Sequence, residues 1–178
     1  MFPFGHLAFG YLSYVFTRLA RRQPLPQGWL VGCVVLGTQL PDLVDKPLTY
    51  AGVLPSGRTL GHSLFFAVPL LVGVGWWAHN AGYDEHAIAW GVGLVSHYVG
   101  DVYSLVLAGD WWTMRFLLWP VFPTVLYPDA DAIPPWVRVV NSLGDPRFRV
   151  QNALFALAGV LWIASVIRRR WGARQNKE

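Results

Sequence analysis

Long stretches without a charged side chain constrain this chain more than any other feature of its sequence. They cover residues 1–17, 23–41, 59–83 and 150–167, with a fifth at 87–109 that only Asp101 interrupts. A helix needs about 20 apolar residues to cross the hydrocarbon core of a bilayer. We therefore predict an all-α fold, a polytopic membrane helix bundle of about five transmembrane helices that forms a single domain over residues 1–178.

The composition supports a membrane protein and excludes several other classes. Apolar residues make up 54% of the chain and charged residues only 13%, whereas a soluble domain has about 25% charged residues. The single cysteine, Cys33, excludes an internal disulfide and a cysteine zinc cluster. No nucleic-acid-binding motif accompanies the net charge of +4, so we expect no nucleic acid partner.

Arginines beside the predicted helices indicate the orientation in the membrane. Arg18, Arg21 and Arg22 follow the first stretch, and Arg168–Arg170 follow the last. Because cytoplasmic loops are enriched in Lys and Arg, both groups should face the cytoplasm. The N-terminus is then outside and the C-terminus inside, and we expect a multi-pass protein of the cell membrane.

Ionisable side chains gather at one end of the predicted helices. In the five-helix topology the outer half of the bundle contains His6, Asp42, Asp45, His62, His97 and Asp101. His97 and Asp101 are four residues apart, on one helix face. Asp42 and Asp45 are three residues apart at the predicted exit of the second helix. Because an acid inside a membrane needs a partner, the pattern predicts a divalent metal site, with zinc favoured and manganese or iron as alternatives.

Each of these residues also has a purely structural explanation. His97 and Asp101 could be an ordinary helix pair, and His62 could cap the helix that follows it. Asp42 and Asp45 could be loop residues. Taken together, positions on four helices that converge on one membrane face favour a shared metal site.

Four segments of the chain resemble, in order, the motifs of the membrane-bound, metal-dependent hydrolase family of the YdjM type. They are GHLAFGY at 5–11, LPDLVDKPL at 40–48, PSGRTLGHSL at 55–64 and SHYVGD at 96–101. The resemblance covers residues 1–110 and implies a metal site. The residues that it implies for this site are His6, Asp42, His62, His97 and Asp101.

Two positions depart from the family pattern. Val44 stands where a second acid is frequent and Asp45 comes one residue later, while Gly61 stands where Thr often precedes His-Ser. The order of the ligands is also similar to that of one zinc site in bacterial zinc-dependent phospholipase C. By analogy, this similarity points to phosphoester chemistry on a lipid.

Hydrolysis of an ester or phosphoester in a lipid-like substrate, by a metal-activated water, is therefore the expected function. Asp45 or Asp42 would act as the base, and Arg58 would hold a phosphate. Thr38, Gln39 and Ser63 are candidate hydrogen-bond partners of the ligands. The alternatives are a metal or proton transporter and a non-catalytic scaffold with a structural metal.

The segment 111–149 differs from the predicted spans. Its apolar part is too short to cross a bilayer and is broken by Pro120, Pro123 and Pro128. We expect an interfacial or re-entrant aromatic segment here, because Trp concentrates at the membrane boundary. Residues 1–110 then supply the helices of the metal site, and residues 150–170 form the last transmembrane helix.

Overall fold

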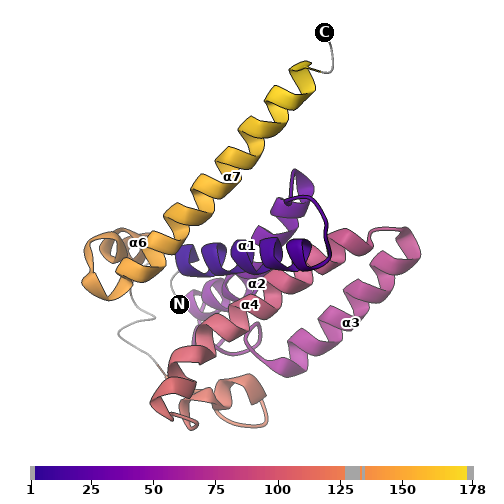
Figure 1. The fold of residues 1–178 in the computed structure, drawn as a ribbon. Coiled ribbons are helices and arrows are strands. Elements are labelled where there is room, and N and C mark those ends of the chain that lie inside the picture. Colours follow the sequence, from indigo (N-terminus) through magenta and orange to yellow (C-terminus); the bar gives the residue numbers. More distant parts are fainter. Residues whose placement is uncertain (1–2, 127–132, 134, 176–178) are drawn as a thin grey trace.

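The fold is a bundle of long helices followed by shorter elements (Figure 1). It was described from a computed structural model, which defines residues 3–126, 133 and 135–175. Over these residues the chain contains no strand. The long helices are α1 (Pro3–Ala20), α2 (Trp29–Tyr50), α3 (Leu64–Ala81), α4 (Asp84–Ala108) and α7 (Arg149–Gln175). The short elements between α4 and α7 are η1 (Thr113–Leu118), α6 (Pro135–Gly144) and η2 (Pro146–Phe148).

The α4 helix lies at the centre and contacts α1, α2, α3 and η1. Its contact with α2 is the most extensive, and glycines on both helices make it close. A Cβ atom at Gly37 would overlap the carbonyl oxygen of Trp90, and one at Gly93 would lie 2.5 Å from the carbonyl oxygen of Val34. A backbone carbonyl of α2 can therefore reach a side chain of α4.

Ion pairs define one end of the bundle and candidate ligands the other. Arg18 and Arg21 bind Glu85 with N–O distances of 3.0 and 2.7 Å. Since α1 ends where α4 begins, these two helices run in opposite directions. The start of α1 thus lies beside the second half of α4, where His6 Nε2 is 3.3 Å from Asp101 Oδ1.

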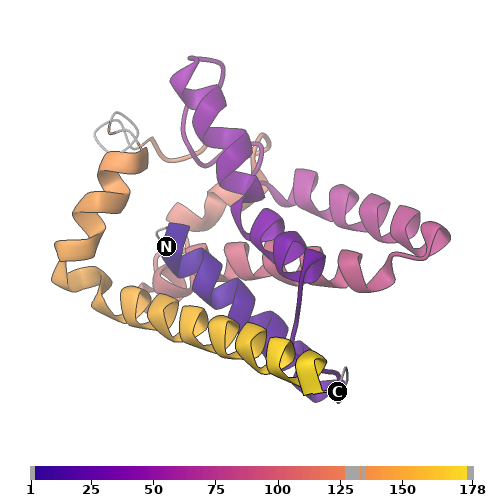
Figure 2. The ribbon, with the colours of Figure 1, turned by 90° about the horizontal axis from the view of Figure 1, so that it is seen from above.

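The last helix, α7, packs against α1. The rings of Phe4 and Phe155 stack with their centroids 4.7 Å apart, and Ala8 and Tyr11 pack against Ala158. The residue numbers of these contacts rise together, so both helices run in the same general direction, and their C-terminal ends lie on the same side in Figure 2. The arginines that follow α1 and those near the end of α7 therefore lie on the same side of the molecule.

The chain after α4 forms short elements. The η1 helix packs on α3 and α4, while Trp111 and Trp112 just before it are exposed. The α6 helix exposes a row of apolar side chains, Val137, Val140 and Leu143. Such surfaces suit a segment at the membrane boundary. Residues 127–132 and 134 of the predicted aromatic segment lie outside the described residues.

Three of the described helices are long and apolar enough to cross a membrane. They are Leu64–Ala81, Asp84–Ala108 and the Arg149–Trp171 part of α7. This confirms the prediction of an all-α membrane bundle, although α1 and α2 do not belong to this set. The α2 helix carries Asp42, Asp45 and Lys46, and charged side chains lower its hydropathy.

The predicted end of the second helix is wrong. The α2 helix continues through Pro41 and Pro47 to Tyr50, because a proline removes one backbone hydrogen bond and bends a helix without necessarily ending it. Asp42 and Asp45 therefore both lie inside the helix. Residues three apart on a helix point about 60° away from each other, so the two acids face different partners.

The predicted orientation can be tested by cysteine labelling in a Cys33→Ala background. Val53→Cys lies in the exposed connection before α3, and Gln27→Cys lies in the exposed connection before α2. A membrane-impermeant thiol reagent added to intact cells should label Val53→Cys and leave Gln27→Cys unlabelled. The opposite pattern would show that the site end of the bundle faces the cytoplasm.

Candidate metal centre

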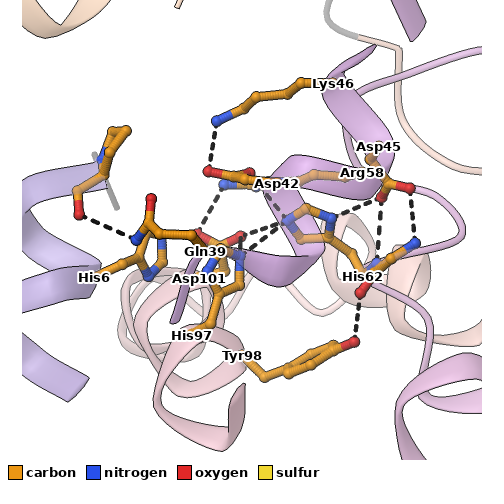
Figure 3. Close-up of polar contacts among 12 residues, drawn as sticks. His6, Gln39, Asp42, Asp45, Lys46, Arg58, His62, His97, Tyr98 and Asp101 are labelled. Atoms are coloured by element: carbon orange, nitrogen blue, oxygen red, sulfur yellow. Dashed lines mark hydrogen bonds and ion pairs between the residues drawn. The ribbon is translucent and has the colours of Figure 1, made fainter. Parts of the chain in front are cut away.

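Two imidazole rings face each other, that of His97 in the second half of α4 and that of His62 in the loop before α3 (Figure 3). His97 Nδ1 donates a hydrogen bond of 2.7 Å to the carbonyl oxygen of Thr38, and His62 Nδ1 donates one of 2.7 Å to Asp45 Oδ2. Because both acceptors lack a hydrogen, each neutral ring carries its proton on Nδ1 and a lone pair on Nε2. The two Nε2 atoms are 3.1 Å apart. Two lone pairs therefore oppose each other unless a cation or a proton lies between them.

Carboxylate oxygens surround the same gap. Asp101 Oδ2 lies 3.4 Å from His62 Nε2 and 3.7 Å from His97 Nε2. Asp42 Oδ1 lies 3.6 Å from His62 Nε2. Ligand atoms in a tetrahedral zinc site with bonds of about 2.0–2.1 Å are separated by about 3.3 Å. The donor atoms are thus spaced as ligands of one divalent cation are, and the mixed imidazole and carboxylate set suits zinc, manganese or iron.

His6 extends the cluster from α1. Its ring stacks on that of His97 with centroids 3.9 Å apart, and its buried Nδ1 atom has no hydrogen-bond partner among the described residues. Among the described residues, two groups of three side chains could hold a metal ion, because in each group the ligand atoms lie within 4.8 Å of one another. They are His6, His97 and Asp101, and Asp42, His62 and His97. Because both groups contain His97, the arrangement can accept one cation or two neighbouring ones.

Asp45 organises the loop that carries His62. It is fully buried, and its Oδ1 accepts a hydrogen bond from the backbone N–H of Gly61, while its Oδ2 accepts from the N–H groups of Thr59 and His62 and from the His62 ring. These bonds offset the cost of removing the carboxylate from water. Asp45 therefore fixes the ring orientation and tautomer of His62, as a carboxylate behind a metal-binding histidine does.

The other side of this loop packs on α2 and α4. A Cβ atom at Gly61 would lie 2.6 Å from the carbonyl oxygen of Pro41, so a larger residue would force the loop away from α2. Tyr98 donates a hydrogen bond of 2.6 Å from its hydroxyl to the carbonyl oxygen of Gly61. Ser63 caps α3 by accepting from the Phe65 N–H. The position of His62 is thus set by three elements of the bundle.

The protonation of His62 depends on its acidic neighbours. Burial lowers the pKa of the His62 imidazole, but hydrogen bonds to Asp101 and Asp45 outweigh it, and the net result is a raised pKa. In the ion-free protein a proton on His62 can therefore occupy the gap between the two Nε2 atoms. A metal ion that binds there has to displace this proton.

Two cationic side chains line the more open side of the cluster. Arg58 lies 3.3 Å from Asp101 Oδ1 and sits over the ring of Phe116, with 5.4 Å from Cζ to the ring centroid. Lys46 Nζ is 2.5 Å from Asp42 Oδ2. Arg58 thus reaches the cluster from the loop before α3, while Lys46 pairs with Asp42 from one helical turn away.

The five predicted metal residues meet in one place, His6, Asp42, His62, His97 and Asp101. Asp45 contacts the His62 ring, but it does not lie where the predicted role as a base would require. Both of its oxygens are bound to the loop and face away from the gap, so its geometry fits a positioning role better than that of a base. Of the predicted hydrogen-bond partners, Thr38 contacts a ligand through its carbonyl group, and Gln39 bonds to Thr38 in turn.

Sequence reasoning missed three residues of the site. Lys46 could have been found, because it stands four residues after Asp42 on the same helix and has the opposite charge. Tyr98 and Phe116 left no such signal. Tyr98 is one of seven tyrosines, and the contact of Phe116 with Arg58 and His62 joins segments that are far apart in the chain.

Comparison with known families places the chain in one of them. The family described as YdjM inner membrane protein matches residues 1–172. The chain belongs to this family. The match extends the resemblance beyond residues 1–110 and, with the apolar helices, makes the YdjM-family protein a multi-pass protein of the cell membrane. Searches of curated proteins and of solved structures give no match.

The first prediction for the site concerns its metal content. His97→Ala removes the nitrogen shared by both candidate groups, so the purified protein should lose most of its bound transition metal. Metal content would be measured by mass spectrometry on protein purified in detergent. His79→Ala is the matched control, because His79 is exposed and pairs with Asp84 away from the cluster. Equal metal in both variants would show that the cluster binds none.

The second prediction concerns Asp45. Asp45→Asn replaces one acceptor oxygen with an N–H₂ group that faces backbone N–H donors, so the loop and the His62 ring should lose their fixed position. Loss of such a partner behind a metal ligand lowers metal affinity by about 10- to 100-fold. Competition with a chelating dye would measure this. If Asp45 were instead a base, the variant would retain the full metal affinity and lose only turnover.

Proposed function

We propose that this YdjM-family protein is a metal-dependent hydrolase that cleaves an ester or phosphoester bond in a lipid-like substrate. The observation that carries the proposal is the gap between His62 Nε2 and His97 Nε2, 3.1 Å wide and bordered by carboxylates. Both rings are held by hydrogen bonds that leave Nε2 available. Such a donor set binds zinc or a similar divalent cation.

The cluster is buried on one side and open on the other, which favours catalysis over a structural role. The side chains of His6 and His62 are 1% exposed and that of His97 is not exposed. Asp42 is 14% exposed, Lys46 22% and Arg58 28%. A structural metal site is closed by protein ligands, whereas a catalytic site keeps one side open for water and substrate.

The residues on the open side of the cluster have different roles in the proposed hydrolysis. The chemistry that a bound divalent cation supplies in such a site is Lewis-acid activation of water and of the scissile group. Asp42 Oδ1 faces the gap, and the salt bridge with Lys46 keeps the carboxylate in its ionised form. With a cation held by His6, His97 and Asp101, Asp42 is not needed as a ligand and is the carboxylate best placed to accept a proton from the attacking water.

The reaction balances without another reagent. The water oxygen forms a bond to the phosphorus or carbonyl carbon of the substrate, and the bond from that atom to the alcohol oxygen breaks. Asp42 takes the proton from water and returns it to the departing alcohol oxygen. Arg58 lies beside Asp101 and its side chain is 28% exposed, so it can donate hydrogen bonds to the oxygens of a phosphate group.

The proposal is tested by assaying purified protein in mixed micelles on phosphate monoester, phosphodiester and carboxylic ester lipids. Activity on at least one class should disappear with chelator and return with added zinc or manganese. Hydrolysis that resists chelation would refute a metal mechanism. No hydrolysis of any class by metal-loaded protein would favour a transporter or a scaffold.

The role of Arg58 gives a sharper test. Arg58→Gln should lower kcat/KM on a phosphoester by about 10- to 100-fold, the effect of losing a charged hydrogen bond. Metal content should stay unchanged. Arg149→Gln, at the exposed start of α7, is the matched control and should behave as the wild type. An equal loss in both variants, or a loss of metal in Arg58→Gln, would contradict phosphate binding by Arg58.

A further inference from the structure

The segment that contains η1 packs over the loop before α3. Ser63, at the end of this loop, donates a hydrogen bond to the carbonyl oxygen of Trp119. Thr124 Oγ1 donates a hydrogen bond of 2.8 Å to the carbonyl oxygen of Arg58. Phe116 is 1% exposed and Thr124 is 8% exposed, so both side chains are enclosed where the segment meets the loop. The segment therefore holds the part of the loop that reaches the metal cluster.

Within this contact, the ring of Phe116 touches two residues of the candidate site. The Arg58 Cζ atom lies over the ring, 5.4 Å from its centroid, which is within the range of a cation–π interaction. The rings of His62 and Phe116 meet edge to face, with their centroids 6.1 Å apart. One aromatic side chain thus contacts both the candidate phosphate-binding residue and a candidate metal ligand.

Both the backbone and the side chain of Arg58 are held in place. Its carbonyl oxygen accepts the hydrogen bond from Thr124, and the N–H group of the next residue, Thr59, donates one of 2.7 Å to Asp45 Oδ2. The guanidinium lies over Phe116 and 3.3 Å from Asp101 Oδ1. A long side chain that is already ordered loses less conformational entropy when it binds a ligand. These contacts therefore prepare Arg58 for binding.

Stacking on Phe116 leaves the polar edge of the Arg58 guanidinium for other partners. All of its N–H donors lie in the plane of the group, whereas the ring of Phe116 is contacted by its face. The Arg58 side chain is 28% exposed, on the open side of the cluster. A phosphate can accept charge-assisted hydrogen bonds from such an edge, and an uncharged carboxylic ester gains less from it.

We propose that Phe116 is a positioning residue that holds the Arg58 guanidinium at the metal cluster, so that the site selects a phosphoester over an uncharged carboxylic ester. The inference rests on the proposed function and narrows its substrate class to anionic phosphoesters. Phe116 acts through Arg58 and takes no part in the bond-breaking step.

The test is a pair of coupled substitutions. Phe116→Leu keeps a buried apolar side chain and removes the aromatic face. It should lower kcat/KM on a phosphoester lipid by about three- to tenfold, the effect of losing a cation–π contact. The kcat/KM on a carboxylic ester lipid and the metal content should stay at the wild-type values. In an Arg58→Gln background, Phe116→Leu should cause no further loss, because the two residues act as a unit.

Trp112→Leu is the matched control. Trp112 belongs to the same segment and makes the same kind of contact with a different arginine, Arg115, at 4.1 Å from Cζ to the ring centroid. This variant should keep the wild-type preference for phosphoesters. Phe116→Met, which also retains an apolar side chain of similar volume, replaces Phe116→Leu if the latter does not fold.

Three outcomes would overturn the proposal. An equal loss on both ester classes would show that Phe116 supports the cluster as a whole. A further loss in the Arg58→Gln background would show an effect that does not pass through Arg58. Loss of bound metal in Phe116→Leu would show that the ring serves to hold His62.

A binding measurement separates this inference from the proposed function. Inorganic phosphate, titrated into metal-loaded protein and followed by calorimetry, should bind about three- to tenfold more weakly to Phe116→Leu than to the wild type. If the protein hydrolyses nothing, the proposed function fails and this titration still tests the role of Phe116. Equal affinity of the two proteins for phosphate, or no binding to either, would refute that role.

Discussion

The close approach of α2 and α4 is the constraint on which the candidate site depends. Gly37 and Gly93 allow the two backbones to touch, and the gain is van der Waals contact between helices that have no hydrophobic drive to associate in lipid. The same approach brings the carbonyl oxygen of Thr38 to His97 Nδ1. Packing thereby selects the tautomer of a histidine and turns its Nε2 toward the ligands from other elements. A shift of α4 by one residue would break both contacts together.

The second half of the site is fixed in a different way, by a buried charge. Asp45 would be costly in the interior without partners, and the loop before α3 supplies them from three backbone N–H groups and one imidazole. The loop gains a defined shape and the acid gains its hydrogen bonds. His62 thus reaches the gap from a loop and His97 reaches it from a helix. The Nδ1 atom of each ring donates a hydrogen bond to an acceptor on the side away from the gap.

Much of this arrangement could be predicted from the sequence. Charge-free stretches locate the long helices, and the rarity of acids in membranes draws attention to Asp101. The predicted exit of the second helix was wrong, because the charge-free stretch ends at residue 41, whereas α2 continues to Tyr50 and contains both Asp42 and Asp45. The role of Asp45 depends on backbone N–H groups, which every residue except proline carries and which no motif marks. Contacts such as that of Arg58 with Phe116 arise only when distant segments fold together.

The order of the helices along the chain has a consequence for biosynthesis. Every candidate ligand lies between His6 and Asp101, and the α1, α2 and α4 helices that carry most of them contact one another directly. Membrane proteins are made from the N-terminus, and early segments can fold while later ones are still being synthesised. The metal site can therefore be completed before α7 leaves the ribosome. The last helix then docks on the outer surface of α1, against a centre that has already formed.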